Sequence, residues 1–281
     1  MASVFTLMGI VNVTPDSFSD GGSFGGSAAA IAHAHRLVAQ GATIVDVGGE
    51  STRPGAEPVP AEEEIRRVVP VVEGIAGVQV SVDTMKLEAA RAAVEAGASY
   101  VNDVTAFRHD PALAGFVAER GLYCCLMHML GEPRTMQAGP VYADVVSEVK
   151  AFLERRLAFA VGEGVREERI MLDPGIGFGK TQAHNLELLR RLDELAALGR
   201  PLVFGASRKS FIGAITGRDA GDRAVGTAAA NVLAFERGAR VFRVHDVAAS
   251  RDALAVAAAT LAPPWTPTET TATTTPSKTR T

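Results

Sequence analysis

Residues 9–22, GIVNVTPDSFSDGG, and residues 45–56, VDVGGESTRPGA, each begin as a short apolar run and end in a cluster of polar residues. The same form recurs in VSVDT (80–84), VNDV (101–104), LMHM (126–129), MLDPGIGFGK (171–180), FGASRKSF (204–211) and FRVHDV (242–247). A helix-like stretch follows each run, and short apolar runs are typical of parallel strands covered on both faces. Eight such units with polar strand ends predict an α/β fold, a single-domain TIM (β/α)₈ barrel. An open doubly wound sheet would show the same alternation, but eight units with a motif at every strand end favour the barrel.

The boundaries of the expected elements follow from the same alternation. Strands are expected near residues 5–11, 43–48, 78–83, 100–103, 122–128, 170–173, 201–206 and 241–244. Six glycines follow helix-like runs, where a left-handed residue commonly ends a helix: Gly41, Gly97, Gly121, Gly164, Gly199 and Gly238. The leucine spacing in NLELLRRLDELAAL (185–198) predicts a helix. Two polar segments, 13–26 and 50–60, are expected to be functional loops.

Composition divides the chain into one folded domain and a tail. Residues 1–262 are expected to form the catalytic barrel, and residues 263–281, rich in Thr and Pro, a disordered C-terminal tail. A formal net charge of −4 gives no support for nucleic-acid binding. No apolar run is long enough to cross a bilayer, so no membrane association is expected. The adjacent Cys124 and Cys125 suggest neither a disulfide framework nor a metal site, which favours the cytoplasm.

Polar residues at the strand ends are the main reason to expect an enzyme. All strand carboxyl ends open on one face of a closed barrel, and active sites of this fold lie there. The side chains expected around one cavity are those of Asn12, Asp46, Asp83, Asn102, His128, Asp173, Lys209, Arg243 and His245.

The carboxylates at these strand ends allow several kinds of chemistry. Asp83, Asp173 and Asn102 can bind the N–H groups and carbonyls along the edge of a guanine-like or pterin-like ring. The paired carboxylates could instead serve as general acid and base, or hold Mg²⁺. For Asp46 alone, a helix cap or loop anchor remains open beside a ligand contact.

Basic residues at other strand ends point to an anion site. Arg243 and His245 lie two apart and share one face of the last strand, while Arg53 and Lys209 belong to other strand-end loops. Together they suit a phosphate or diphosphate, although surface salt bridges are the usual role of such residues. The segment GIGFGKT is not a P-loop, because GxxxxGK[ST] requires glycine where Pro174 stands.

Eight motifs in order resemble one known family. They are NVTPDSFSDGG, DVGGESTRPGA, SVDTMK, NDV, LMHMLGEPRTMQ, LDPGIGFGK, SRKSFIG and RVHDV, and they run from about Val4 to Val247. The resemblance is to the dihydropteroate synthase family of pterin-binding enzymes, the sulfonamide target. It implies a barrel that joins a dihydropterin-methyl diphosphate to 4-aminobenzoate in folate synthesis, releasing diphosphate. One departure is TAFRHDP, where the family usually has a glycine pair after NDV, and this difference concerns the shape of that loop and not the chemistry.

The resemblance also implies a role for each matching residue. The catalytic set would be Asp83, Asp173, Lys209, Arg243 and His245. The pterin would contact Asp83, Asn102, Met127, Asp173, Lys209 and Arg243. The diphosphate would contact Asn12, Thr52, Arg53, Arg243 and His245, with Asn12 also meeting Mg²⁺. The 4-aminobenzoate and its loops would involve Phe18, Asp20, Arg53, Pro54, Phe178, Lys209 and Ser210. A homodimer is a further family expectation.

Two alternative functions share parts of this pattern. A methyltetrahydrofolate–corrinoid methyltransferase would share the ring-binding aspartates and asparagine, but it would not need STRPG, SRKSF and RVHDV. A non-catalytic pterin-binding paralogue would be expected to have lost Asn12, Arg53, Lys209 or His245, and the chain keeps all four.

Overall fold

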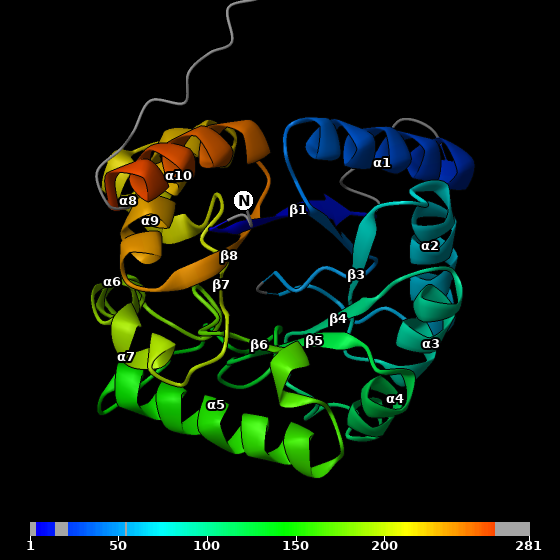
Figure 1. Cartoon of the computed structure of the whole chain (residues 1–281), viewed down its shortest axis with the longest axis horizontal. Helices are drawn as coiled ribbons and strands as arrows, with labels where there is room; N and C mark the ends of the chain where they lie inside the picture. The colour runs from blue at the N-terminus through cyan, green and yellow to red at the C-terminus, as the bar shows by residue number, and fades with distance from the viewer. Residues whose placement is uncertain (1–3, 15–21, 54, 262–281) are drawn as a thin grey trace, which may run out of the picture.

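Eight parallel strands close into a barrel in the computed structural model, which describes residues 4–14, 22–53 and 55–261 (Figure 1). Each strand pairs with the next, and β8 pairs with β1. The strands are β1 (Thr6–Asn12), β2 (Ile44–Gly48), β3 (Gln79–Asp83), β4 (Tyr100–Asp103), β5 (Tyr123–Met127), β6 (Ile170–Asp173), β7 (Leu202–Phe204) and β8 (Ala239–Val244). The predicted TIM barrel and its eight strands are confirmed.

Helices form a ring outside the barrel (Figure 1). They are α1 (Gly22–Ala39), α2 (Ala61–Gly74), α3 (Leu87–Glu95), α4 (Ala112–Arg120), α5 (Val145–Gly162), α6 (Gln182–Arg190), α7 (Leu192–Ala196), α8 (Ser210–Thr216), α9 (Ala224–Glu236) and α10 (Val247–Leu261). The six glycines expected at helix ends all have positive φ. The last described helix ends at Leu261, so the predicted tail lies outside the described residues.

Alternation along the strands separates two cores. In β2, Val45 and Val47 belong to the large apolar core between strands and helices. Ile44 belongs instead to a smaller cluster with Met8, Tyr100, Cys125, Met171, Val203 and Val241. Cys124 and Cys125 lie in different clusters, because neighbouring strand residues point to opposite faces. Beyond this apolar layer, Asp46 and Arg243 form an ion pair, so charged groups follow it toward the carboxyl ends of the strands.

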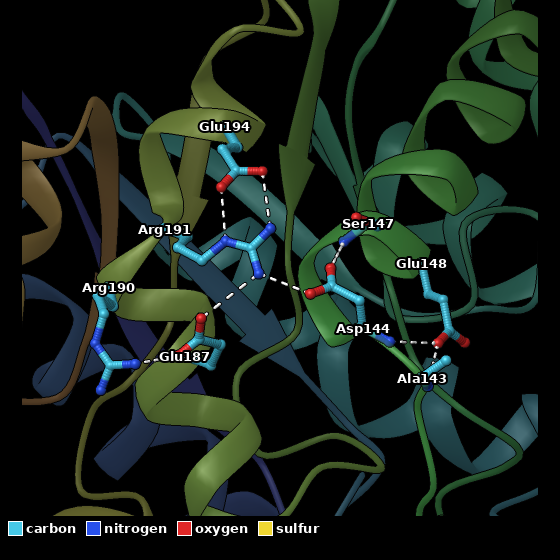
Figure 2. Close-up of polar contacts among 8 residues, drawn as sticks. All are labelled: Ala143, Asp144, Ser147, Glu148, Glu187, Arg190, Arg191 and Glu194. Atoms are coloured by element: carbon cyan, nitrogen blue, oxygen red, sulfur yellow. Dashed lines mark hydrogen bonds and ion pairs between the residues drawn. The ribbon is translucent and has the colours of Figure 1, made fainter.

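The predicted helix over residues 185–198 is two helices, α6 and α7, with the break at Arg191. The Arg191 guanidinium bonds Glu194 in α7 and approaches Glu187 in α6 to 3.5 Å. It also donates to Asp144, the residue that caps the N-terminus of α5, over 2.7 Å (Figure 2). The leucine period continues through the break because both short helices turn buried leucines to the same core. The side-chain pattern therefore concealed the change in the backbone.

Two other boundaries differ from the sequence expectation. Helix α1 begins at Gly22, so part of the expected loop over residues 13–26 is helical. Strand β7 ends at Phe204 instead of residue 206, and its pairing with β8 shifts between Leu202 and Val203.

The segment TAFRHDP keeps a glycine-like conformation without glycine. Ala106 and Phe107 have φ of 53° and 61°, in the left-handed region, and both are fully buried. Asp103 accepts from the backbone N–H of Phe107 at 2.7 Å, and Arg156 donates to the carbonyl of Ala106 at 2.7 Å. These bonds hold two residues in a conformation that costs roughly 1–2 kcal/mol each. The departure from the family pattern thus leaves a left-handed loop after β4.

Within the described residues, no helix is both long enough and apolar enough to cross a membrane.

Candidate active site

An arginine bound to two carboxylates lies at the centre of the barrel mouth. Arg243 of β8 donates from Nε to Asp46 and from Nη2 to Asp83, each over 2.6 Å. Asn102 of β4 donates to the same Asp46 oxygen over 3.1 Å. The strand register places Asp83 beside Asn102. Four residues far apart in sequence thus form one hydrogen-bonded layer.

Burial and mutual charge tune this layer. Burial raises the pKa of Asp83 to about 7, with Arg243 opposing the rise and the Asp46 carboxylate adding to it. Burial alone would lower the pKa of Arg243, but Asp46 and Asp83 hold it above its usual value. The Asp83 carboxyl therefore titrates near neutral pH, beside a guanidinium that stays charged.

A second charged pair lies at the ends of β6 and β7. Asp173 accepts from the backbone N–H of Gly175 at 2.6 Å, and burial raises its pKa against the opposing charge of Lys209. Burial lowers the pKa of Lys209 to about 8, with Asp173 acting in the opposite direction. The Lys209 ammonium donates to the carbonyl of Ile176 and lies 4.5 Å from the centre of the Phe178 ring.

One wall beside these charges is apolar. Met127 is buried with Val104, Met129 and Met136, and Phe178 packs against this cluster. A flat ring could therefore meet sulfur and aromatic groups on this side and carboxylates in the layer below.

Groups suited to an anion lie on the other side. Asn12 ends β1, and an added Cβ at its strand neighbour Gly48 would lie 3.8 Å from the Asn12 carboxamide oxygen. Thr52 is half-buried in the loop after β2, and Arg53 is exposed there. Arg53 lies near enough to His245 for its charge to help lower the pKa of that ring.

His245 is a neutral imidazole. Burial lowers its pKa to about 3, and the charges of Arg243 and Arg208 add to the effect. Ser207 Oγ accepts from the backbone N–H of His245 at 3.1 Å and lies 2.9 Å from ring Nδ1. A hydroxyl that donates to Nδ1 leaves the ring proton on Nε2, where it can serve an anion. His245 thus offers a hydrogen bond, and not the positive charge that the sequence analysis had grouped with the arginines.

Two of the expected strand-end residues are not open to a ligand in the shared cavity. His128 turns away from it toward α5, where its ring meets Phe152 at 4.8 Å, and the expectation for this residue was wrong. Asp46 is neither a helix cap nor freely exposed to a ligand, because Arg243 and Asn102 engage one oxygen of its buried carboxylate.

For the other residues expected at the site, the structure gives only a position in the chain or no description. Ser210 is exposed at the start of α8. Phe18, Asp20 and Pro54 lie outside the described residues. The site roles inferred from the family resemblance stay predictions, although the structure brings Asp83, Asn102, Asp173, Lys209 and Arg243 together.

Sequence reasoning missed the charged residues that support the site. Lys86 bonds both Glu50 and Glu64, which ties the loop after β2 to α2. Arg208 has φ of 57° and makes a two-point ion pair with Asp246. Lys180 is buried after the GIGFG sequence. Each of these six residues except Glu64 stands within or next to a motif quoted above, and that position was the available signal.

The described residues contain no group of three or more His, Cys, Asp or Glu side chains arranged to hold a metal ion. Asn12 ends β1 with a carboxamide oxygen, a type of ligand that suits Mg²⁺. Its carboxamide makes no hydrogen bond to any other described residue, so its oxygen is available as a single hard ligand.

Known proteins resemble this chain over nearly its whole length. The family described as "Pterin binding enzyme" matches residues 8–245. Dihydropteroate synthase of Escherichia coli K12 is 47% identical over 258 residues, which cover 91% of each chain. The structure of Xanthomonas albilineans dihydropteroate synthase with 4-aminobenzoic acid has a TM-score of 0.87 at 50% identity, covering 92% of this chain and 94% of that one. The same enzyme in complex with 7,8-dihydropteroate gives 0.85 at 46% identity, covering 94% and 96%.

Proposed function

The chain belongs to the pterin-binding enzyme family and is a dihydropteroate synthase, and we propose how the barrel mouth divides that reaction among its own residues. The reaction condenses (7,8-dihydropterin-6-yl)methyl diphosphate with 4-aminobenzoate to 7,8-dihydropteroate and diphosphate, in tetrahydrofolate biosynthesis. The observation that carries the assignment is the buried layer of Asp46, Asp83, Asn102 and Arg243 beside Asp173 and Lys209. No observation favours the corrinoid methyltransferase or the non-catalytic paralogue.

The ring site is the buried layer. Asp173 and Asn102 present oxygen and amide groups to the pterin edge, which carries both N–H donors and acceptors. Arg243, held flat by two carboxylates, is the face on which the ring stacks, and Met127 is part of the wall. Asp83 and Asp173 stabilise positive charge that develops on the ring when the diphosphate leaves.

The leaving-group site comprises Asn12, Thr52, Arg53 and His245. Arg53 supplies a full positive charge, while neutral His245 supplies a hydrogen-bond donor. We propose that Arg243 contributes its positive charge to the diphosphate from the buried layer, because two carboxylates already engage its guanidinium. This division differs from a simple arc of cations, because the donors and the charges come from different residues.

Mg²⁺ is the metal that this site suits. Asn12 would hold it through the carboxamide oxygen, because Mg²⁺ is often bound by very few protein oxygens together with water and substrate phosphate. When bound, Mg²⁺ neutralises negative charge on the leaving diphosphate.

The arylamine site lies against Phe178, Lys209 and Ser210, with Phe18, Asp20, Arg53 and Pro54 assigned from the family resemblance. In the reaction, the bond between the methylene carbon and a diphosphate oxygen breaks, and its electron pair leaves with the diphosphate. The amine lone pair then forms the C–N bond, and its surplus proton passes to water or diphosphate. An arylamine is largely neutral at pH 7, so the site needs no strong base and no Ser, Cys or His nucleophile. It must instead exclude water, which would capture the carbocation.

We also propose a homodimer in the cytoplasm. Five large apolar side chains are exposed on α8, α9 and α10, which lie together on one side of the barrel in Figure 1: Ile215, Val225, Leu233, Val256 and Leu261. Apolar groups gathered on one side support a subunit interface there. The free, buried Cys124 and Cys125 support a reducing compartment.

Purified protein tests this function directly. With the pterin diphosphate, 4-aminobenzoate and Mg²⁺, we expect stoichiometric dihydropteroate and diphosphate, and we expect EDTA to abolish turnover. Binding of a pterin without turnover would contradict the assignment.

Two variants separate the ring site from the leaving-group site. Asp173→Ala leaves pterin N–H groups unpaired and should weaken binding of a pterin that lacks the diphosphate by roughly 1–3 kcal/mol. His245→Ala should leave that affinity unchanged within error and weaken binding of the diphosphate ester, because His245 is assigned to the leaving group. Calorimetry with both ligands measures the difference, and equal losses from the two variants would refute this division.

A further inference from the structure

The GIGFGK loop, residues 175–180, contains a buried lysine without a carboxylate partner among the described residues. Lys180 is 3% exposed, and its ammonium lies 2.8 Å from His128 Nδ1. It also lies 3.0 Å from the carbonyl oxygens of Gly175 and Phe178. With the more distant His128 carbonyl oxygen at 3.5 Å, these acceptors surround the nitrogen and can satisfy all of its N–H donors. Burying such a group is costly unless every donor is satisfied, so the site is built around this side chain.

The loop before Lys180 has its carbonyl oxygens bound by side chains. Side chains donate to every backbone carbonyl from Gly175 to Gly179. The donors are Lys180 for Gly175 and Phe178, Lys209 for Ile176, Gln137 for Gly177 and Tyr142 for Gly179. Lys180 is the one donor that binds two of these carbonyls, so it closes the loop on itself.

The contacts of this loop lead to the arylamine site. Phe178, whose carbonyl Lys180 binds, lies with its ring 4.5 Å from the Lys209 ammonium. Gly175, the other residue whose carbonyl Lys180 binds, donates its N–H to Asp173. Lys180 itself is buried against His128 and is not exposed to the cavity. It therefore touches residues that form the site while remaining outside it.

We propose that Lys180 is a positioning residue that fixes Phe178 for the arylamine. This inference rests on the proposed function of the site and adds a residue to it. The motif that resembles a P-loop thus uses its lysine inwardly, on its own backbone, and not on a phosphate. The acceptor His128 is part of the same device, which explains why this strand-end histidine turns away from the cavity.

A double-variant cycle in the full-length protein tests the proposal. Lys180→Met keeps the length of the side chain and removes its three donors. We expect the KM for 4-aminobenzoate to rise about tenfold, and kcat and the pterin affinity to change less than about threefold, because Phe178 is the only residue bound by Lys180 whose side chain is assigned to a substrate. In a Phe178→Leu background, the same change should raise KM less than about twofold, since the group that Lys180 positions is already gone.

Tyr142→Phe is the matched control. It removes the bond to the Gly179 carbonyl in the same loop without touching Phe178. It should lower the thermal midpoint and leave the KM for 4-aminobenzoate unchanged. If Lys180→Met folds poorly, His128→Leu removes the ring nitrogen that lies 2.8 Å from Lys180 and should raise the same KM by a smaller factor.

The outcomes separate this proposal from the proposed function. A wild-type protein that forms no dihydropteroate overturns the function itself. Normal wild-type turnover, with an equal KM increase for Lys180→Met in both backgrounds, overturns the positioning role. A parallel loss of pterin affinity and aminobenzoate affinity does the same, because it would mean a general loosening of the barrel mouth.

Discussion

Two loops at the barrel mouth are held in opposite ways. The GIGFGK loop after β6 is bonded along its whole length, with a side-chain donor on each carbonyl from Gly175 to Gly179. The ESTRPG loop after β2, residues 50–55, is bonded at its base, where Lys86 binds Glu50. In the described part of the chain, no side chain donates to the carbonyls of Ser51, Thr52 or Arg53. The first loop presents a fixed wall, and the second leaves Arg53 exposed for an anion to engage.

The largest expected effect is the loss of stability from a Gly→Ala substitution in the GIGFGK loop, which is compared with the same substitution in the ESTRPG loop. In Gly175→Ala the new Cβ would lie 1.9 Å from the His128 carbonyl oxygen, at a φ of 66°. Gly55 has a φ of 80°, but nothing lies within 4 Å of its added Cβ. We expect Gly175→Ala to cost about 4 kcal/mol or more of unfolding free energy, and Gly55→Ala only the left-handed penalty of about 1 kcal/mol. Urea unfolding measures both, and similar costs would show that the two loops are equally constrained.

The second effect concerns the base of the ESTRPG loop. Lys86→Met leaves Glu50 and the fully buried Glu64 without their shared cation. We expect a loss of about 3 kcal/mol in unfolding free energy, because breaking a buried ion pair leaves an uncompensated charge. Arg190→Met removes an exposed pair with Glu187 and should cost less than about 1 kcal/mol. A loss no larger for Lys86→Met than for the Arg190 control would mean that this loop is not held at its base.

The smallest effect is the pH dependence that the Asp83 carboxyl contributes to the stability of the folded protein. Burial raises the folded-state pKa of Asp83 from 3.8 to about 7. The folded protein therefore binds the Asp83 proton more tightly than the unfolded chain does. This contribution to stability is complete below about pH 4 and is lost as pH rises through about 7.

Asp83→Asn should remove that loss. Between pH 5 and 8 the wild-type thermal midpoint should fall relative to that of Asp83→Asn, by about 2–4 °C for each kcal/mol involved. Scanning calorimetry across this range gives the slope of the thermal midpoint against pH for each protein. The slopes are compared, and not the absolute midpoints, because Asp83→Asn also weakens the pair with Arg243 and so lowers stability at every pH. Parallel curves would show that Asp83 does not titrate in this window.

The sequence predicted the parts of the site that follow from strand ends. Asp83, Asn102 and Asp173 end strands whose apolar runs are unmistakable, and closure of the barrel brings such residues to one face. It could not predict their partners. Arg243 and Asp46 are 197 residues apart, and nothing local indicates that they form an ion pair. For the same reason His128 was placed in the cavity, since a strand end does not say which way a side chain turns.

Backbone conformation shows the same division. The glycines at helix ends were predictable because only glycine adopts positive φ without cost. Ala106 and Phe107 adopt it as well, held by Asp103 and Arg156, and only these distant contacts explain it. The helix predicted over residues 185–198 breaks at Arg191 because that side chain bonds α6, α7 and the cap of α5.

By itself the sequence determined the barrel, the face on which chemistry occurs and the family, since these depend on periodicity and on residue type at strand ends. Tertiary structure alone decided the charge state of the site and the support of its loops. The pKa of Asp83, the neutrality of His245 and the inward turn of Lys180 all depend on burial among groups distant in the chain. Desolvation and ion pairing act through space, so a linear pattern carries no direct record of them.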